Sequence, residues 1–418
     1  MPSPLRSLPA LLAALAACAP NPSPPVQVMA LVEKGPNTYQ PSQVQLELVT
    51  DVVSLSGPLG AVLGNARLVL DGNDPLWLNA TTDEGRIAAI TKQPGSPVHV
   101  SYVDKGGVLW PADFHSWNMV SAWFNLEQAY RYWQGVGVPG AEMQGLTLHY
   151  FPEFSIPAGS GAVRPEVDNA FFFSPLQAFV VLPFDELQAV PLALNAGIMA
   201  HEFSHRVFNR RVYDGASLPA PLVSWPVGGA SAGANLLKAA DEGFADYHAY
   251  GASCLGAGGC NPNFLSASLP STYTEPRDFT RADRCLSSAQ REALEAMTFE
   301  TYNASGGPYV VGTVLAAALY QAGEKSGQRQ EIQRALLAAY ANGAPDTPGL
   351  KETLVGLANR GNLLRLETLA GVLASQVEDT QTRKLLCNEL LGRLKLRPVD
   401  VPQCPAASAP VPDCKDVP

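Results

Sequence analysis

The residues best suited to do chemistry lie near the middle of the chain, where His201, Glu202 and His205 form the pattern His-Glu-x-x-His. Two histidines four positions apart project from one face of a helix, so both imidazoles can bind the same metal ion. The glutamate beside the first histidine can reach a water held at that site and act as a base. Histidines on an apolar helix face are also common as structural residues, so the surrounding sequence has to decide between the two roles.

A third ligand is expected, because catalytic zinc usually binds three protein side chains and leaves one position open. A second helical pattern contains the run Asp-Glu-Gly-Phe-Ala-Asp, in which Glu242 and Asp246 lie four positions apart and share a face. Glu242 is the candidate ligand, and Asp246 can accept the hydrogen bond of an imidazole nitrogen that faces away from the metal. The alternative is an acidic helix face in solvent.

These two motifs resemble those of the fungalysin-type gluzincin metallopeptidases, which belong to the wider thermolysin-like group. That family typically reads His-Glu-Tyr-x-His-Gly-Ile-x-Asn-Arg and then Glu-Gly-Trp-x-Asp; this chain reads His-Glu-Phe-Ser-His-Arg-Val-Phe-Asn-Arg and Glu-Gly-Phe-Ala-Asp. The resemblance covers residues 114–321. It implies that His201, His205 and Glu242 bind Zn²⁺. Glu202 would be the general base, and Asp246 would be the carboxylate partner of an imidazole.

The chain departs from the family pattern near the first motif. Arg206 replaces the usual glycine, and the segment from His205 to Glu242 is longer than the family usually shows. A Pro-, Gly- and Ala-rich stretch at residues 217–233 predicts an inserted loop that accommodates the extra length.

Peptide hydrolysis also needs a donor for the negative charge that develops on the carbonyl oxygen. Fungalysin relatives usually place a histidine there, in a Val-His-x-x-Gly phrase at the start of a later helix. The similar phrase here has Tyr309 at that position, and a phenol can donate the same hydrogen bond. Tyr302 is the second candidate, and a structural tyrosine is the equal alternative. The replacement of histidine by tyrosine is also compatible with weakened or altered activity.

A substrate-binding strand is implied by the run Asp-Asn-Ala-Phe-Phe-Phe. In thermolysin-like enzymes an Asn-Ala-aromatic segment forms the edge strand that pairs with the substrate backbone. The resemblance therefore implies that Asn169 and Ala170 hold a peptide by strand addition. A plain buried strand is the alternative.

The helices that must position these residues are visible in the hydrophobic pattern. Apolar residues and both histidines recur every three or four positions over residues 194–212, which predicts a helix that begins near Pro191 and ends near Gly215. A second helix is predicted over residues 235–250. An aromatic-rich amphipathic helix is predicted over residues 119–133, closed by Gly135.

Strands are predicted from alternation at residues 44–48 and 66–70, and from apolar runs at 146–151 and 178–182. Asp83-Glu84-Gly85 is interpreted as a turn between strands. From residue 328 onward the pattern is mostly helical. The expected fold is α+β: a β-rich N-terminal segment, then a thermolysin-like zinc peptidase with a mixed-sheet lobe and a helical C-terminal lobe.

The expected divisions along the chain are a signal peptide with a lipidation motif (1–18), a Pro-rich tether and β-rich region (19–110), a sheet lobe with the zinc helix (111–215), a helical lobe with the third ligand (216–398) and a Pro- and Cys-containing tail (399–418). The first of these has one arginine and a short apolar run that ends in Leu-Ala-Ala-Cys. It is similar to the bacterial lipoprotein box, which implies a lipid on Cys18; ordinary secretion is the alternative.

Composition and cysteine usage fit an exported globular protein. The chain has 418 residues, of which 46% are hydrophobic and 16% charged, and a net charge of −10, which argues against nucleic acid as a partner. Six cysteines besides Cys18 predict disulfides, and we favour a bond between Cys254 and Cys260. Membrane attachment is expected through lipid alone.

The function expected from these features is zinc-dependent hydrolysis of peptide bonds in proteins or peptides at the bacterial cell envelope. Two alternatives stay open. One is an envelope protein of the same fold that binds peptides with little or no catalysis, against which the intact Glu202 argues, because binding needs no base. The other is a zinc hydrolase that acts on cell-wall peptides.

Overall fold

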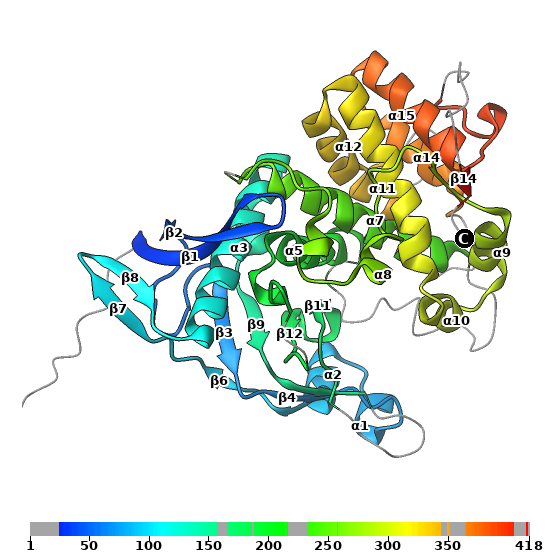
Figure 1. Cartoon of the computed structure of the whole chain (residues 1–418). Coiled ribbons are helices and arrows are strands. Elements are labelled where there is room, and N and C mark those ends of the chain that lie inside the picture. Colours follow the sequence, from blue (N-terminus) through cyan, green and yellow to red (C-terminus); the bar gives the residue numbers. More distant parts are fainter. Residues whose placement is uncertain are drawn as a thin grey trace, which may run out of the picture.

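The computed structural model describes residues 25–156, 165–185, 188–213, 215, 232–256, 258–343, 349–351, 364–404 and 415–416. The fold is α+β, as the sequence predicts. A β-rich half contains the N-terminal segments, and a helical half contains the C-terminal ones; three long helices lie between them (Figure 1). The predicted signal peptide and Cys18 lie outside the described residues, as does nearly all of the predicted inserted loop.

The main sheet has five strands in the order β11 (Ala170–Phe173), β12 (Ala178–Val181), β9 (Leu146–Tyr150), β3 (Gly60–Gly64) and β6 (Ser96–Pro97). The inner strands β12, β9 and β3 run parallel, and β12 is apolar and buried along its whole length, as expected for a strand covered on both faces. Strand β11 is antiparallel to β12 and forms one edge. Because β3 pairs with β9, the sheet crosses the division expected at residue 110.

The remaining strands form three smaller sheets, which are β2-β1-β8-β7 (Thr38–Leu46, Val26–Gly35, Val108–Pro111, Tyr102–Lys105), β10-β4-β5 (Glu153–Ser155, Arg67–Val69, Thr91–Gln93) and β13-β14 (Arg284–Cys285, Lys415–Asp416). The predicted turn at Asp83 is wrong. Thr82 has extended backbone and its hydroxyl accepts a hydrogen bond from the Gly85 N–H, so it caps helix α2 (Asp83–Ile90).

Three long helices position the candidate site: α3 (Phe114–Val136), α5 (Ala196–Val212) and α7 (Ala232–Ser253). The predicted start of α5 near Pro191 is five residues too early. Asn195 caps the helix through its side chain, which accepts from the Ile198 N–H, whereas Pro191 precedes a 3₁₀ turn. Helix α3 ends at Gly137, whose φ of 124° suits glycine, and not at Gly135.

The other helices are α1 (Pro75–Leu78), α4 (Gly140–Met143), α8 (Ser271–Thr274), α9 (Ser288–Ala296), α10 (Phe299–Ala304), α11 (Gly307–Ser326), α12 (Arg329–Ala341), α14 (Leu366–Ser375) and α15 (Thr380–Arg393). Helix α7 packs against α5 on one side and against α11 on the other. It therefore joins the two halves at the level of the predicted metal site.

Disulfides connect segments of the helical half. Cys254 is bonded to Cys260, which confirms the favoured pair, and Cys387 is bonded to Cys404. Cys285 is also disulfide-bonded. Within the described residues, no helix has the length and apolar character needed to cross a membrane.

Candidate metal centre

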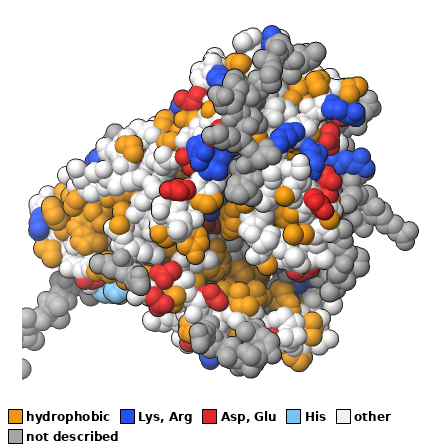
Figure 2. Space-filling model, turned by 45° about the vertical axis from the view of Figure 1, so that its right-hand side comes forward, with side chains coloured by type: hydrophobic (Ala, Val, Ile, Leu, Met, Phe, Trp, Pro, Cys, Tyr) orange, Lys and Arg blue, Asp and Glu red, His pale blue; other side chains and the backbone are white. Residues whose placement is uncertain are grey.

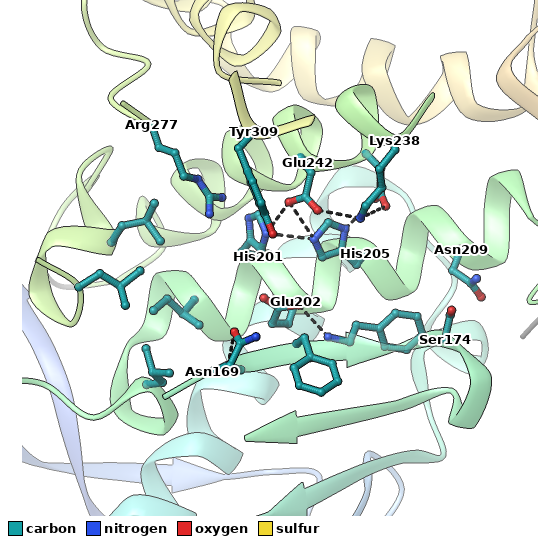
Figure 3. A pocket seen from close by; sticks show the side chains of 18 of the residues that line it. Asn169, Ser174, His201, Glu202, His205, Asn209, Lys238, Glu242, Arg277 and Tyr309 are labelled. Carbon is teal, nitrogen blue, oxygen red and sulfur yellow. Dashed lines mark hydrogen bonds and ion pairs between the residues drawn. The ribbon is translucent and has the colours of Figure 1, made fainter. Parts of the chain in front are cut away.

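Helix α5 presents His201, Glu202 and His205 at the floor of a cleft between the two halves (Figure 3). The helix is held by the apolar side chains of its other faces, and His201 is 5% exposed. The two imidazole rings are perpendicular, with centroids 4.6 Å apart, and their Nε2 atoms lie 3.0 Å from each other. The spacing predicted from the sequence therefore brings both rings to one point.

Glu242 reaches the same point from α7. Its Oε2 lies 3.5 Å from Nε2 of His201 and 3.5 Å from Nε2 of His205, and the three groups could together hold one metal ion. A tetrahedral zinc site with ligand bonds of about 2.0–2.1 Å has neighbouring ligand atoms about 3.3–3.4 Å apart. The three observed separations lie close to that value, so the side chains as placed fit a small tetrahedral ion.

Each imidazole is also held from behind by a carboxylate. The Nδ1 of His201 lies 2.9 Å from Oδ1 of Asp246, as the sequence predicts, and the Nδ1 of His205 lies 2.7 Å from Oδ1 of Asp241. These partners direct both Nε2 atoms toward the cleft. Asp241 was missed in the sequence, although it directly precedes Glu242 and the second histidine needs a partner of its own.

Two cations complete the cluster, and neither was anticipated. Arg277 donates to Asp246 at 2.7 Å, and its guanidinium lies 4.6 Å from the centre of the Tyr309 ring. Lys238 approaches Oε1 of Glu242 at 2.7 Å and Asp241 at 3.4 Å. Isolated basic residues in loops and helices carry no sequence signal for such a role.

The electrostatics of the cluster favour a bound cation. Burial lowers the pKa of His205, but Asp241 and Glu242 outweigh burial and raise it to about 10. For His201 the pKa is also raised, because Asp246 outweighs burial. Burial raises the pKa of Glu242, whereas Lys238 and His205 outweigh that effect and keep it well below its ordinary value. A pocket that stabilises positive charge on two histidines is strongly electronegative.

Glu202 lies beside the metal cluster and contacts the edge strand. Its Oε2 accepts a hydrogen bond of 2.7 Å from the backbone N–H of Phe172 on β11. Burial raises the pKa of the Glu202 carboxyl, an effect that the nearby His201 and His205 oppose. The base predicted from the sequence is therefore fixed by the strand predicted to bind substrate.

Asn169 and Ala170 line the same cleft, but they differ in what they can offer a ligand. The Asn169 carbonyl accepts from the Leu182 N–H, so it faces β12. Backbone groups alternate in direction along an antiparallel strand, which directs Ala170 and Phe172 to the open edge. The Ala170 N–H already donates to the Asn169 side chain at 2.9 Å and the Phe172 N–H to Glu202, so the carbonyls of Ala170 and Phe172 are the outward-facing groups.

Of the two candidate tyrosines, only Tyr309 lines the cleft. It lies in the first turn of α11, is 42% exposed, and points toward His201 and Glu242 (Figure 3). Glu242 and burial raise its pKa to about 12, so the phenol keeps its proton and remains a donor. Tyr302 is fully buried on α10 and packs against Gly307, which removes it as a candidate.

The cleft itself has a volume of about 420 Å³. It is lined by both apolar and polar side chains, which include Leu192, Ile198, Leu265, Leu269 and Phe299 and also Ser174, Asn209 and Tyr213. The hollow near the centre of the space-filling view is lined by hydrophobic side chains (Figure 2). An extended chain with apolar side chains would suit this shape.

Arg206, which stands where the fungalysin-type pattern has glycine, has a structural role. Arg206 is 1% exposed and donates to the carbonyl oxygens of Met143 at 2.5 Å and Gln144 at 2.8 Å. Arg210 donates to the Glu142 carbonyl at 2.6 Å. These are carbonyls at the C-terminal end of α4, which lack partners within the helix. Arg206 thus ties α4 to α5 on the side away from the cleft.

No protein-family model matches the chain, and no curated protein matches it.

Proposed function

We propose that the protein is a zinc-dependent metallopeptidase of the gluzincin type. One observation carries the proposal: the carboxylate of Glu202 bonds to the open edge strand at Phe172 while it lies beside the cluster of His201, His205 and Glu242. A base, a group of metal ligands and a strand edge that can bind a peptide backbone therefore share one cleft. Peptide binding alone would require only the strand edge.

The donor set supports zinc as the metal. Two imidazole nitrogens and one carboxylate oxygen are a common ligand set of catalytic zinc, and carboxylates behind the imidazoles are typical of such sites. When bound here, zinc would lower the pKa of a water molecule and polarise the carbonyl of the scissile bond.

The chain's own residues supply the proton transfers. Glu202 removes a proton from the water as the water oxygen attacks the carbonyl carbon, and it returns that proton to the departing amine when the C–N bond breaks. Tyr309 keeps its proton and donates a hydrogen bond to the carbonyl oxygen, where negative charge develops. The outward-facing Ala170 carbonyl accepts a backbone N–H of an extended substrate.

We also propose the bacterial cell envelope as the setting. The support is the predicted lipid on Cys18, together with the disulfides Cys254–Cys260 and Cys387–Cys404, which are typical of oxidising compartments.

The proposed function is tested by cleavage of a mixed peptide library by the purified protein, beside its Glu202→Gln variant. We expect cleavage by the wild type, a loss of about 10²–10⁴-fold in kcat/KM in the variant, and equal zinc content in both. Glu295→Gln, which changes an exposed glutamate on α9, is the matched control and retains activity. If neither wild type nor variant cuts although both hold zinc, a peptide-binding role replaces the proposal; cleavage of cell-wall peptides alone would redirect it to that substrate.

A further inference from the structure

Lys238 lies in the cleft, one helical turn before Glu242 on α7. Its ammonium Nζ is 2.7 Å from Oε1 of Glu242 and 3.4 Å from Oδ2 of Asp241 (Figure 3). The side chain is 32% exposed, and its ammonium reaches both carboxylates. A hydrogen bond between two charged groups at this distance is among the stronger polar contacts in proteins.

The contact makes the two oxygens of Glu242 unequal. Oε1 is bound by Lys238, whereas Oε2 is buried and has no hydrogen-bond partner among the described residues. Oε2 is also the oxygen that lies 3.5 Å from both imidazole Nε2 atoms. The carboxylate is thus oriented with one oxygen toward the metal position and the other away from it.

We propose that Lys238 is a positioning residue that makes Glu242 a one-oxygen ligand and so keeps two positions on the metal for water and substrate. This inference rests on the proposed function. A carboxylate can bind a metal through one oxygen or through both. Three protein ligands leave room for a water and for expansion to five ligands during the reaction. A second oxygen from Glu242 would occupy one of those positions.

The helix favours this arrangement. Residues four apart on a helix lie side by side, so the backbone keeps Lys238 within reach of Glu242. Lys238 also offsets part of the negative charge of Glu242 and of Asp241, which lies behind the His205 imidazole. Oε2 of Glu242, which faces the metal position, has no hydrogen-bond donor among the described residues.

The test replaces zinc by Co²⁺, whose visible absorption is intense with four ligands and weak with five or six. We expect the wild type to give the intense spectrum and Lys238→Met to give a several-fold weaker one with the same bound cobalt. In the zinc form, Lys238→Met should lose about 10–100-fold in kcat. Lys238→Arg keeps a cation near Oε1 and should restore both the spectrum and the activity.

Lys325→Met is the matched control, because Lys325 pairs with Glu389 in the helical half and does not line the cleft. It should match the wild type in both measurements. Lys238→Ala serves if the methionine variant does not fold. An unchanged cobalt spectrum in a folded Lys238 variant overturns the inference even when the wild type cuts peptides. Loss of the proposed function is a separate result, in which the wild type itself cuts nothing.

Discussion

At the scale of single residues, the site depends on groups that do not touch the metal position. Asp246 and Asp241 each hold one imidazole by its Nδ1, at 2.9 Å and 2.7 Å. An imidazole with a fixed Nδ1 hydrogen directs its Nε2 lone pair in one direction. The ring therefore already has the orientation that metal binding requires. The two carboxylates also add negative charge without occupying a ligand position.

Asp241→Asn should weaken zinc binding by about 10–100-fold, because an amide is a poorer acceptor and carries no charge. Competition with a coloured chelator measures this affinity directly. Asp283→Asn removes a carboxylate that pairs with Arg281 outside the cleft and is the control. Equal affinities of the wild type and Asp241→Asn would show that this partner does not matter for binding.

Tyr309→Phe should lower kcat by about 10²–10³-fold with little change in KM, because the phenol acts on charge that appears only in the transition state. Tyr302→Phe is a close control, since it removes the same atom from a buried ring outside the cleft. If Tyr309→Phe keeps full activity, the hydroxyl of Tyr213, which also lines the cleft, becomes the next donor to test.

At the scale of elements, the site depends on the close packing of α7 between α5 and α11. Gly243 follows the third ligand, and a Cβ there would collide with the Gly312 carbonyl of α11. A Cβ at Gly312 would in turn lie 2.8 Å from the Ala239 carbonyl. The two glycines allow the helix backbones to touch, and this contact places Tyr309 beside Glu242.

Gly243→Ala should reduce the free energy of unfolding by about 1–3 kcal/mol, because a methyl group must fit where backbone lies. It should also lower kcat, since α11 carries Tyr309. Denaturant unfolding and peptide cleavage measure the two effects. Gly135→Ala is the control and should increase the free energy of unfolding. A Cβ at this position meets nothing within 4 Å, and alanine is favoured over glycine in a helix by up to about 1 kcal/mol.

At the scale of the whole molecule, the cleft is formed by both halves. The edge strand β11 belongs to the β-rich half, the base lies on α5 between the halves, and Tyr309 comes from α11 in the helical half (Figure 1). A metal ion held by α5 and α7 would link helices that are separated in sequence, so binding energy would contribute to the stability of the fold.

Zinc at a free concentration one hundred times its Kd should stabilise the protein by about 2.7 kcal/mol. Removal by a chelator should therefore lower the Tm by several degrees, and added zinc should restore it. Glu242→Gln should lose most of this zinc-dependent shift, whereas Glu295→Gln should keep it. A chelator that leaves the wild-type Tm unchanged would contradict a metal held by these three side chains.

The local features of this protein, such as helix spacing and strand pattern, are determined by its sequence. The spacing of His201 and His205 on a helix brings their imidazoles together, because the period of a helix is a local property of the backbone. The α+β fold class, the inner strands β9 and β12 and the motif that supplies Glu242 follow from patterns of the same kind, whereas β3 at Gly60–Gly64 was not predicted.

Only the tertiary structure decided which groups from different elements meet. It paired Asp241 with His205, set Lys238 on one oxygen of Glu242, joined Glu202 to the Phe172 N–H and separated Tyr309 from Tyr302. These contacts depend on the crossing of α5, α7 and α11 and on their packing against the sheet. A difference of one residue in helix register would change all of them, and hydrophobic periodicity alone does not encode that register.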